Sequence, residues 1–250
     1  MKLLVVVLCL LSERFLIHSF SHQRFAWFGE YAALIRKKTD NHAALDNAWM
    51  KLALIVLPII IAVSILYFLF YNVFYGFGGL VLSIIIFFYC LGPQNPFYPV
   101  SESGTGELSE EFSGQYFVLA NSQLFAVLFW YLAAGPIAAL AYRLISLSQN
   151  IDSVSAQAKQ VTDVLDWIPA RLTALLLLLA GNFQRGFSTF TKLVLSAPDS
   201  NDKILSECGM QAVRVKDEEQ TPVSVAEELV EHATIVLLVF IALFTLAAWL

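Results

Sequence analysis

The stretch from Leu52 to Ser101 contains no Asp, Glu, Lys or Arg. A membrane core about 30 Å thick is crossed by a helix of about 20 apolar residues, and this stretch supplies two such segments, 52–71 and 77–92. The turn is predicted at Asn72 to Gly79, where Asn72, Gly76, Gly78 and Gly79 interrupt the aliphatic run with flexible backbone. The sequence therefore predicts a membrane-embedded helical hairpin, with Pro58 kinking its first helix.

The composition of the whole chain extends this prediction beyond the hairpin. Hydrophobic residues make up 58% and charged residues 14%, against about 45–50% and 25% in soluble domains. Further apolar segments lie at 122–143, 164–181 and 233–250, and polar loops lie at 20–51, 93–120 and 182–232. We therefore expect an all-α, polytopic membrane bundle of about five or six transmembrane helices with amphipathic interfacial helices, forming a single integral membrane domain over 1–250.

The segment 2–19 decides between five and six transmembrane helices. It is apolar from Leu3 to Leu11, but Glu13 and Arg14 follow within the same segment. Three interpretations remain open: an uncleaved transmembrane helix in which these two side chains face protein, a cleaved signal peptide, or an interfacial helix. The first is favoured because the small residues of a cleavage site are poorly placed. Glu13 and Arg14 would then pair with Asp166 or Arg171.

Basic residues predict the orientation of the helices. Most of the 15 Lys and Arg residues lie in the loops 20–51 and 182–232, which the positive-inside rule places in the cytoplasm. The run Arg36–Lys38 is short and suits lipid head groups, and the sequence has no basic stripe of the kind that binds nucleic acid. Residues 183–194 carry Phe at helical spacing and predict an amphipathic helix, either interfacial or packed against the bundle.

Residue types of soluble catalytic and metal sites are sparse. Cys9, Cys90 and Cys208 are scattered and odd in number, which predicts neither a zinc site nor a set of disulfides. His18 and His22 have a metal-compatible spacing of four residues but no accompanying third ligand. The sequence contains no phosphate-loop, nucleophile-elbow or zinc-protease motif. We therefore predict no catalytic residue and no metal ligand.

Polar residues at or near membrane depth are the remaining candidates for a functional site, because ionisable groups are costly there and often functional. Arg143 and Arg171 could together hold a phosphate or carboxylate, since guanidinium groups bind such anions in bidentate fashion. A structural role is the alternative: Asp166 caps a helix, Arg171 pairs with an acid or reaches head groups, and Arg143 fixes topology. The predicted ligand-binding set is Asn121, Tyr142, Arg143, Asp166, Trp167 and Arg171, with Glu13 and Arg14 in support.

Three patterns in this region resemble the AmpE proteins of bacterial inner membranes, which are related to the enzymes CbiB and CobD. They are Leu128-Phe129-Trp130, then Gly135 to Arg143 (GPIAALAYR), then Val164 to Leu172 (VLDWIPARL). The resemblance implies a multi-pass inner-membrane protein with an accessory or signalling role in the response to β-lactam antibiotics, linked to β-lactamase induction and cell-wall recycling. Its expected partners are the lipid bilayer, an anionic cell-wall-derived ligand and another membrane protein; no cofactor is expected.

The cobalamin enzymes define the main alternative. A ligase of the CbiB and CobD type joins an amine to a corrinoid carboxylate with ATP and magnesium, and it needs acidic metal ligands beside the arginines. Those enzymes carry acidic and Asn-Asp-Gly residues before the Phe-Trp pair and a Pro-Asn-Ala-Gly-Trp loop later. This chain has Asn121-Ser122-Gln123 and Ser200-Asn201-Asp202-Lys203 instead. A third alternative is a structural partner of another membrane protein, with no small ligand.

Overall fold

The computed structural model describes residues 2–15, 25–39, 47–72, 75–91, 110–214 and 223–247, and all regular structure within these ranges is helical. The prediction of an all-α protein is confirmed. The chain divides into two compact units: unit 1 comprises Met1–Pro93 and Val127–Leu165, and unit 2 comprises Gln94–Ala126 and Asp166–Leu250. A single integral membrane domain over 1–250 stays a prediction.

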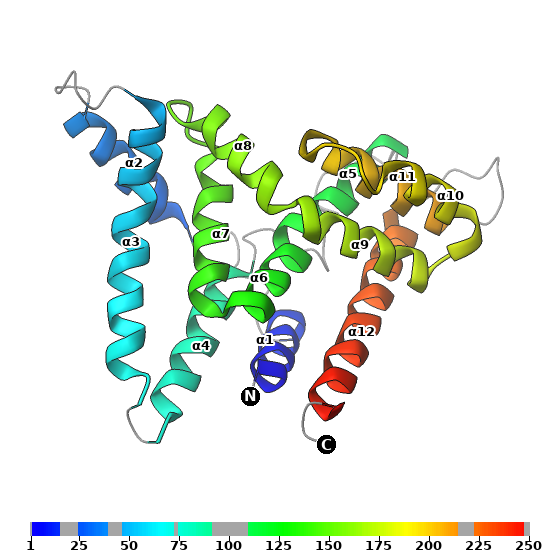
Figure 1. Cartoon of the computed structure of the whole chain (residues 1–250), viewed down its shortest axis with the longest axis horizontal. Helices are drawn as coiled ribbons and strands as arrows, with labels where there is room; N and C mark the ends of the chain where they lie inside the picture. The colour runs from blue at the N-terminus through cyan, green and yellow to red at the C-terminus, as the bar shows by residue number, and fades with distance from the viewer. Residues whose placement is uncertain are drawn as a thin grey trace. The chain divides into compact units, whose positions relative to one another are not determined.

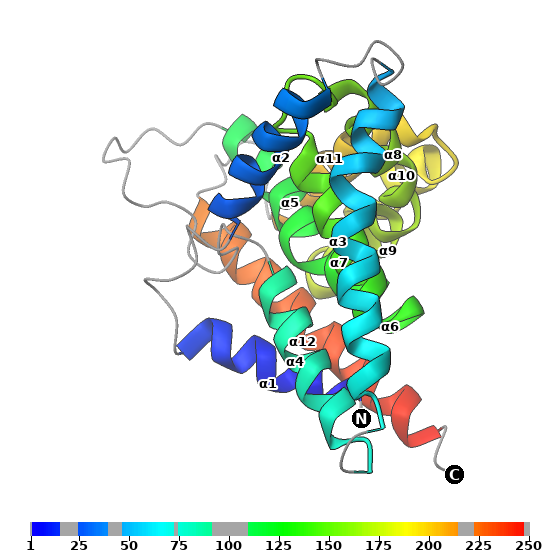
Figure 2. The same ribbon diagram turned by 90° about the vertical axis from the view of Figure 1, so that its left-hand side faces the viewer.

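Unit 1 is a helical bundle with α4 and α7 at its centre. Helix α7 packs against α3, α4 and α8, and α4 also contacts α1. Figure 1 shows α3, α4 and α7 side by side, and Figure 2 shows α1 crossing α4. The helices are α1 (Lys2–Phe15), α2 (Ala26–Thr39), α3 (Ala48–Phe70), α4 (Phe77–Cys90), α6 (Ala126–Ala134), α7 (Pro136–Ser148) and α8 (Ser155–Leu165). The first residue of α6, Ala126, is the last residue of a unit 2 segment.

Helix α3 has the length and surface of a transmembrane helix. Asn47 caps its start by accepting a hydrogen bond from the Trp49 backbone N–H at 3.0 Å. Its 23 residues extend about 35 Å at a rise of 1.5 Å per residue, and Pro58 lies inside it as predicted. Large apolar side chains, such as Phe68 and Leu69, are exposed on it. A soluble protein rarely exposes such a surface, and the helix is long and apolar enough to cross a membrane.

The turn between α3 and α4 is shorter than predicted. Helix α4 begins at Phe77, so Gly79 belongs to the helix rather than to the turn. Two left-handed residues, Tyr75 at φ 57° and Gly76 at φ 91°, reverse the chain. Gly79 is needed for close contact, because a Cβ atom there would lie 3.0 Å from the Tyr71 carbonyl oxygen. Glycines of this region therefore serve both the turn and the packing of the hairpin.

The helix predicted over 122–143 is not formed as one element. Helix α5 (Glu110–Ala120) continues through a π-helical turn, Asn121–Phe125, into α6. Gly135 then adopts φ 90°, which glycine tolerates, and Pro136 starts α7 at a position where its missing N–H costs nothing. The candidate transmembrane helix in this region is therefore Ser113–Ala134.

Unit 2 is organised around α11, which packs against α5, α9, α10 and α12. In Figure 1, α5, α10 and α11 gather near the start of α12, and α12 extends away from them. The predicted loop 182–232 thus contains two helices and the start of a third. Besides α5, the elements are α9 (Trp167–Ala180), α10 (Phe183–Leu193), the 3₁₀ turn Pro198–Ser200, α11 (Asn201–Val213) and α12 (Val223–Ala247).

The amphipathic helix predicted over 183–194 is present as α10, and it packs against α9 and α11. Its close approach to α9 occurs at Gly186, where an added Cβ would lie 2.1 Å from Leu178 Cδ2. Phe183 and Phe187 of the same helix are exposed, and their rings stack with centroids 4.9 Å apart. One face of α10 is therefore packed on unit 2, and an aromatic face remains uncovered within it.

Three helices in the described part of the chain are long and apolar enough to cross a membrane: Ala48–Phe70, Ser113–Ala134 and Ser224–Ala247. The last of these begins before the predicted segment 233–250. Shorter apolar helices occur at Phe77–Cys90, Pro136–Ser148 and Trp167–Ala180. The chain is thus a membrane protein, and a total of five or six spans stays a prediction. Residues 16–24 of the N-terminal region and residues 93–109 of the predicted polar loop 93–120 lie outside the described ranges.

Cys208 provides a test of the packing around α11. Its side chain is completely buried, and burial, with a smaller contribution from Glu207, raises the pKa of the thiol to about 12. We expect a maleimide at pH 8 to leave Cys208 unmodified in the native protein and to label it in SDS, because the thiolate is the reactive form. Peptide mass spectrometry identifies the labelled cysteine. Fast labelling of Cys208 in the native protein would contradict this packing.

The same thiol gives a pH dependence of stability. The folded pKa of about 12 lies above the ordinary value of 9.0, so folding disfavours the thiolate. The contribution of the thiol to stability is therefore complete below pH 9 and is lost as the pH rises towards 12. A Cys208→Ala variant should lose this part of the alkaline destabilisation, which SDS or thermal unfolding between pH 8 and 11 measures.

Candidate functional site

Arg171 lies one turn into α9. Helix α9 begins at Trp167 and ends before Gly181, within the predicted segment 164–181. Pro169 lies in the first turn, where a missing N–H is tolerated. Asp166 stands at the N-cap position and is buried, but its side chain makes no capping hydrogen bond. The capping role predicted for Asp166 is therefore not observed.

All five N–H groups of the Arg171 guanidinium donate to acceptors within unit 2. Nε donates to the Val194 carbonyl at 2.9 Å, and Nη1 donates to the Trp167 carbonyl at 2.8 Å and to Asn201 Oδ1. Nη2 donates to the Ser196 carbonyl at 2.8 Å and to Ser196 Oγ at 3.2 Å. Because arginine has five such donors, its hydrogen-bonding capacity is filled. Every acceptor is uncharged. The structural role predicted for Arg171, in which it pairs with an acidic side chain, is therefore not what these contacts show.

Trp167 completes the cluster around this guanidinium. The Arg171 Cζ atom lies 4.5 Å from the centroid of the Trp167 ring, a distance that gives a cation–π interaction. The indole Nε1 donates to the Ser196 carbonyl at 3.0 Å. We call Trp167, Arg171, Val194, Ser196 and Asn201 the arginine lock, because together they hold the connection between α10 and α11 against the start of α9.

Asn121 makes a second link to α9. The residue is 1% exposed and lies in the π-helical turn, where its Oδ1 accepts a hydrogen bond from Thr173 Oγ1 at 2.8 Å. Thr173 follows Arg171 by two positions and is also buried. Asn121 thus attaches the π-helical turn to α9, whereas Arg171 attaches α9 to the connection between α10 and α11. Both side chains act in packing.

Arg143 and Tyr142 belong to unit 1, where both side chains are buried. Arg143 Nε donates to the Cys90 carbonyl at 2.7 Å. Cys90 is the last residue of α4, and the final carbonyls of a helix lack partners within it. The positive guanidinium also suits the negative end of the helix dipole. Arg143 therefore ties α7 to the end of α4.

The residues of the predicted ligand site are thus divided between the units. Within unit 2, anion binding at Arg171 would require the guanidinium to give up hydrogen bonds that it already makes. An anion site at the two arginines stays a prediction, and the observed contacts account for the Arg171 donors without it. The structure places Asn121, Asp166, Trp167 and Arg171 in unit 2, places Tyr142 and Arg143 in unit 1, and does not describe the side chains of Glu13 and Arg14.

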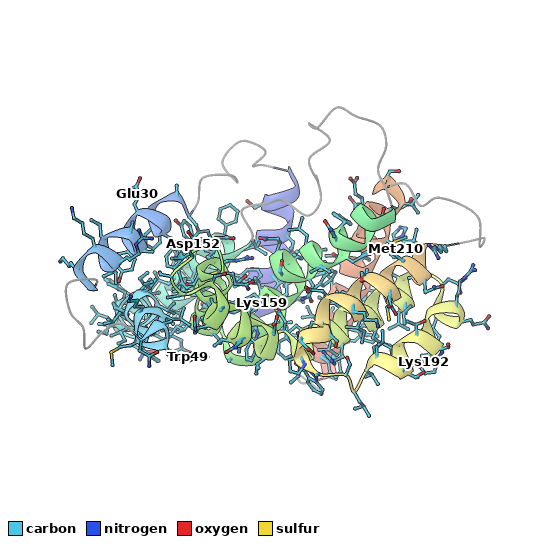
Figure 3. All side chains as sticks on the ribbon, turned by 90° about the horizontal axis from the view of Figure 1, so that it is seen from above. Glu30, Trp49, Asp152, Lys159, Lys192 and Met210 are labelled. Atoms are coloured by element: carbon cyan, nitrogen blue, oxygen red, sulfur yellow. The ribbon has the colours of Figure 1, made fainter. Side chains whose placement is uncertain are left out.

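Unit 2 also contains a charged cavity that the sequence analysis missed. Its volume is about 760 Å³, and residues of α5, α10 and α11 line it. Both signs of charge are present, and Lys203 Nζ lies 3.9 Å from Glu207 Oε1. Lys192 of α10 is exposed and is not part of the lining (Figure 3). Polar members of the lining include Gln115, Thr189, Asp202, Lys203, Glu207, Gln211 and Arg214.

A local signal for this cavity exists in the sequence. Lys203 and Glu207 are four residues apart, a spacing that places opposite charges on one helix face. Because residues 182–232 were predicted to form a polar loop, this helical spacing was not used to predict the cavity. Within the described helices, no three His, Cys, Asp or Glu residues gather to hold a metal ion. Two acidic residues of the predicted polar loop 93–120, Glu102 and Glu107, lie outside those helices.

Comparison with known proteins adds no assignment to this geometry. No protein-family model, curated protein or solved structure matches the chain. The resemblance to AmpE stays an expectation from the sequence pattern.

Proposed function

We propose that this chain is an AmpE-like accessory protein of the bacterial inner membrane that acts in the response to β-lactam antibiotics by binding a cell-wall-derived ligand in the charged cavity of unit 2. The observation that carries the proposal is the arginine lock. Arg171 and Trp167 both belong to the AmpE-like pattern Val164 to Leu172. Arg171 bonds the first residue of α11, Asn201, and Trp167 bonds the Ser196 carbonyl shortly before it. Residues of that pattern thus support the helix that forms one wall of the cavity.

The charges of the cavity favour a ligand that carries groups of both signs. Asp202 and Glu207 are acidic, and Lys203 and Arg214 are basic. A cell-wall fragment with a short peptide offers carboxylates and an ammonium group, so it complements this lining. The volume of about 760 Å³ lies within the range of small-molecule sites, about 300–1,000 Å³.

The location of the cavity agrees with this role. Besides residues of α5, it is lined by residues of α10 and α11, which lie in the segment 182–232. The Lys and Arg residues of that segment assign it to the cytoplasm under the positive-inside rule. The same unit includes Ser224–Ala247, which is long and apolar enough to anchor it in a membrane. A ligand from the cytoplasm could therefore bind next to the bilayer and alter the contacts of this protein with a membrane partner.

Thermal unfolding of the purified full chain in detergent tests the proposal. Muropeptides at about 100 times their Kd should stabilise the native state by about 2.7 kcal/mol, and Lys203→Gln combined with Arg214→Gln should abolish the shift. Lys192→Gln, outside the cavity, should retain it. In cells, loss of the gene should change β-lactamase induction, and the double variant should fail to restore it.

Two results would contradict the proposal. A stabilising shift with magnesium-ATP or a corrinoid precursor, and none with muropeptides, would support the ligase alternative. If muropeptides cause no shift and β-lactamase induction is unchanged in cells lacking the gene, the AmpE-like role is wrong.

A further inference from the structure

Unit 1 contains a second cavity, of about 650 Å³, where α3 and α4 meet. Its lining differs from that of the charged cavity because no lining residue carries a formal charge. Residues of α1, α3, α4, α6 and α7 contribute, so the cavity forms only when the hairpin packs against the rest of unit 1. The lining residues that carry the argument are Tyr67, Tyr71, Asn72, Ser83 and Tyr131.

Tyr131 provides the clearest sign of a ligand. The residue is 2% exposed and lines the cavity, and its ring is held against Phe87 with centroids 4.5 Å apart. Among the described residues, its hydroxyl has no hydrogen-bonding partner in the protein, and the hydroxyl oxygen is open to the cavity rather than enclosed by protein. The O–H group can therefore donate to a ligand oxygen in the cavity.

Tyr67 and Ser83 define a complementary acceptor. The Ser83 hydroxyl donates to the Gly79 carbonyl at 2.8 Å, and the Tyr67 hydroxyl lies 3.4 Å from Ser83 Oγ. Because the Ser83 proton is already used, Tyr67 is the donor of that pair. The Tyr67 oxygen then retains lone pairs that can accept. The cavity therefore offers a donor at Tyr131 and an acceptor at Tyr67.

We infer that this cavity binds a neutral, polyhydroxylated group, such as a sugar. Hydroxyl groups both donate and accept, so one ring can satisfy Tyr131 and Tyr67 together, and phenol rings supply apolar surface for its faces. An anion would find no cation among the lining residues, and an acyl chain would leave the Tyr131 hydroxyl without a partner. This inference does not depend on the function proposed for unit 2.

The sugar could belong to a membrane glycolipid or to a soluble molecule, and two probes distinguish the sources. The full chain in detergent is titrated with monoglucosyl diacylglycerol and, separately, with methyl β-glucoside, and native mass spectrometry counts the bound molecules. Unglycosylated diacylglycerol and phosphatidylethanolamine serve as comparison lipids. We expect the glucolipid to bind more tightly than either comparison lipid. Binding of the soluble glucoside as well would identify a soluble ligand.

Two conservative variants remove the predicted hydrogen bonds. Tyr131→Phe deletes only the hydroxyl and should weaken glucoside or glucolipid binding about three- to tenfold, as expected for a neutral hydrogen bond. Tyr67→Phe deletes the acceptor oxygen and should weaken binding by a similar factor. Tyr31→Phe, on α2 and outside the cavity lining, should bind as the native protein does. Circular dichroism confirms that each variant is folded.

The inference is wrong if neither glucoside probe binds, if phosphatidylethanolamine binds as tightly as the glucolipid, or if Tyr131→Phe leaves the affinity unchanged.

Discussion

Replacing Arg171 with Gln should lower the free energy of unfolding by about 3–5 kcal/mol, because it leaves several buried acceptors without a donor. Arg171→Lys should be almost as damaging. Lysine keeps the charge, but its compact ammonium group cannot reach the five acceptors that the planar guanidinium serves. SDS unfolding followed by circular dichroism measures the loss.

The lysine variant separates a structural arginine from a ligand-binding one. If Arg171 serves mainly as a positive charge for an anion, Arg171→Lys should retain near-native stability, which would contradict the arginine lock. Arg36→Lys, at an exposed position of α2, is the matched control and should have no effect. Limited proteolysis adds a local readout, since release of the lock should expose the segment 194–200 to cleavage.

Replacing Gly209 with Ala should destabilise the protein by about 2 kcal/mol, through overpacking between α11 and α5. An added Cβ would lie 2.3 Å from Cδ2 of Phe117, and the Phe117 side chain is completely buried. An aromatic ring in a filled core cannot move aside as an exposed flexible chain can. Thermal unfolding in detergent measures the change.

Two further variants check that explanation. Gly29→Ala on α2 has no neighbour within 4 Å of the new Cβ, so helix propensity should stabilise it by up to about 1 kcal/mol. Combining Gly209→Ala with Phe117→Leu should cost less than the sum of the two single changes, because the smaller side chain makes room. Strict additivity would show that the ring is not the obstacle.

Features that depend on near neighbours in sequence were predictable. The start and end of α9 follow from Trp167, Pro169 and Gly181, and the helical hairpin follows from the charge-free apolar stretch and its glycines. These signals act within a few residues, so they need no knowledge of the fold. The all-α class follows from the same local information.

Features that depend on distant residues were not predictable. Arg171 was identified as a candidate, but four of its five acceptor atoms lie 23 to 30 positions further along the chain. Only the fold of α10 and α11 brings them together. Tyr67 and Tyr131 likewise share one cavity although they are far apart in sequence.

The break at Gly135 was missed for a different reason. Hydropathy continues across Gly135 and Pro136, so residues 122–143 look like one helix when only composition is considered. A local Gly-Pro signal was present, but the apolar residues around it favoured a continuous span. Backbone conformation, rather than polarity, ends α6.

The arginine lock consists of hydrogen bonds from a guanidinium to uncharged oxygens, with no acidic side chain among the acceptors. A guanidinium does not lose its proton at any pH that a cell experiences, and carbonyl and amide oxygens do not titrate. Acidification of the surroundings therefore cannot break these bonds as it breaks a carboxylate salt bridge, and shielding by dissolved ions acts weakly on a buried group. The attachment of α10 and α11 to α9 should hold across wide changes in acidity and ionic strength.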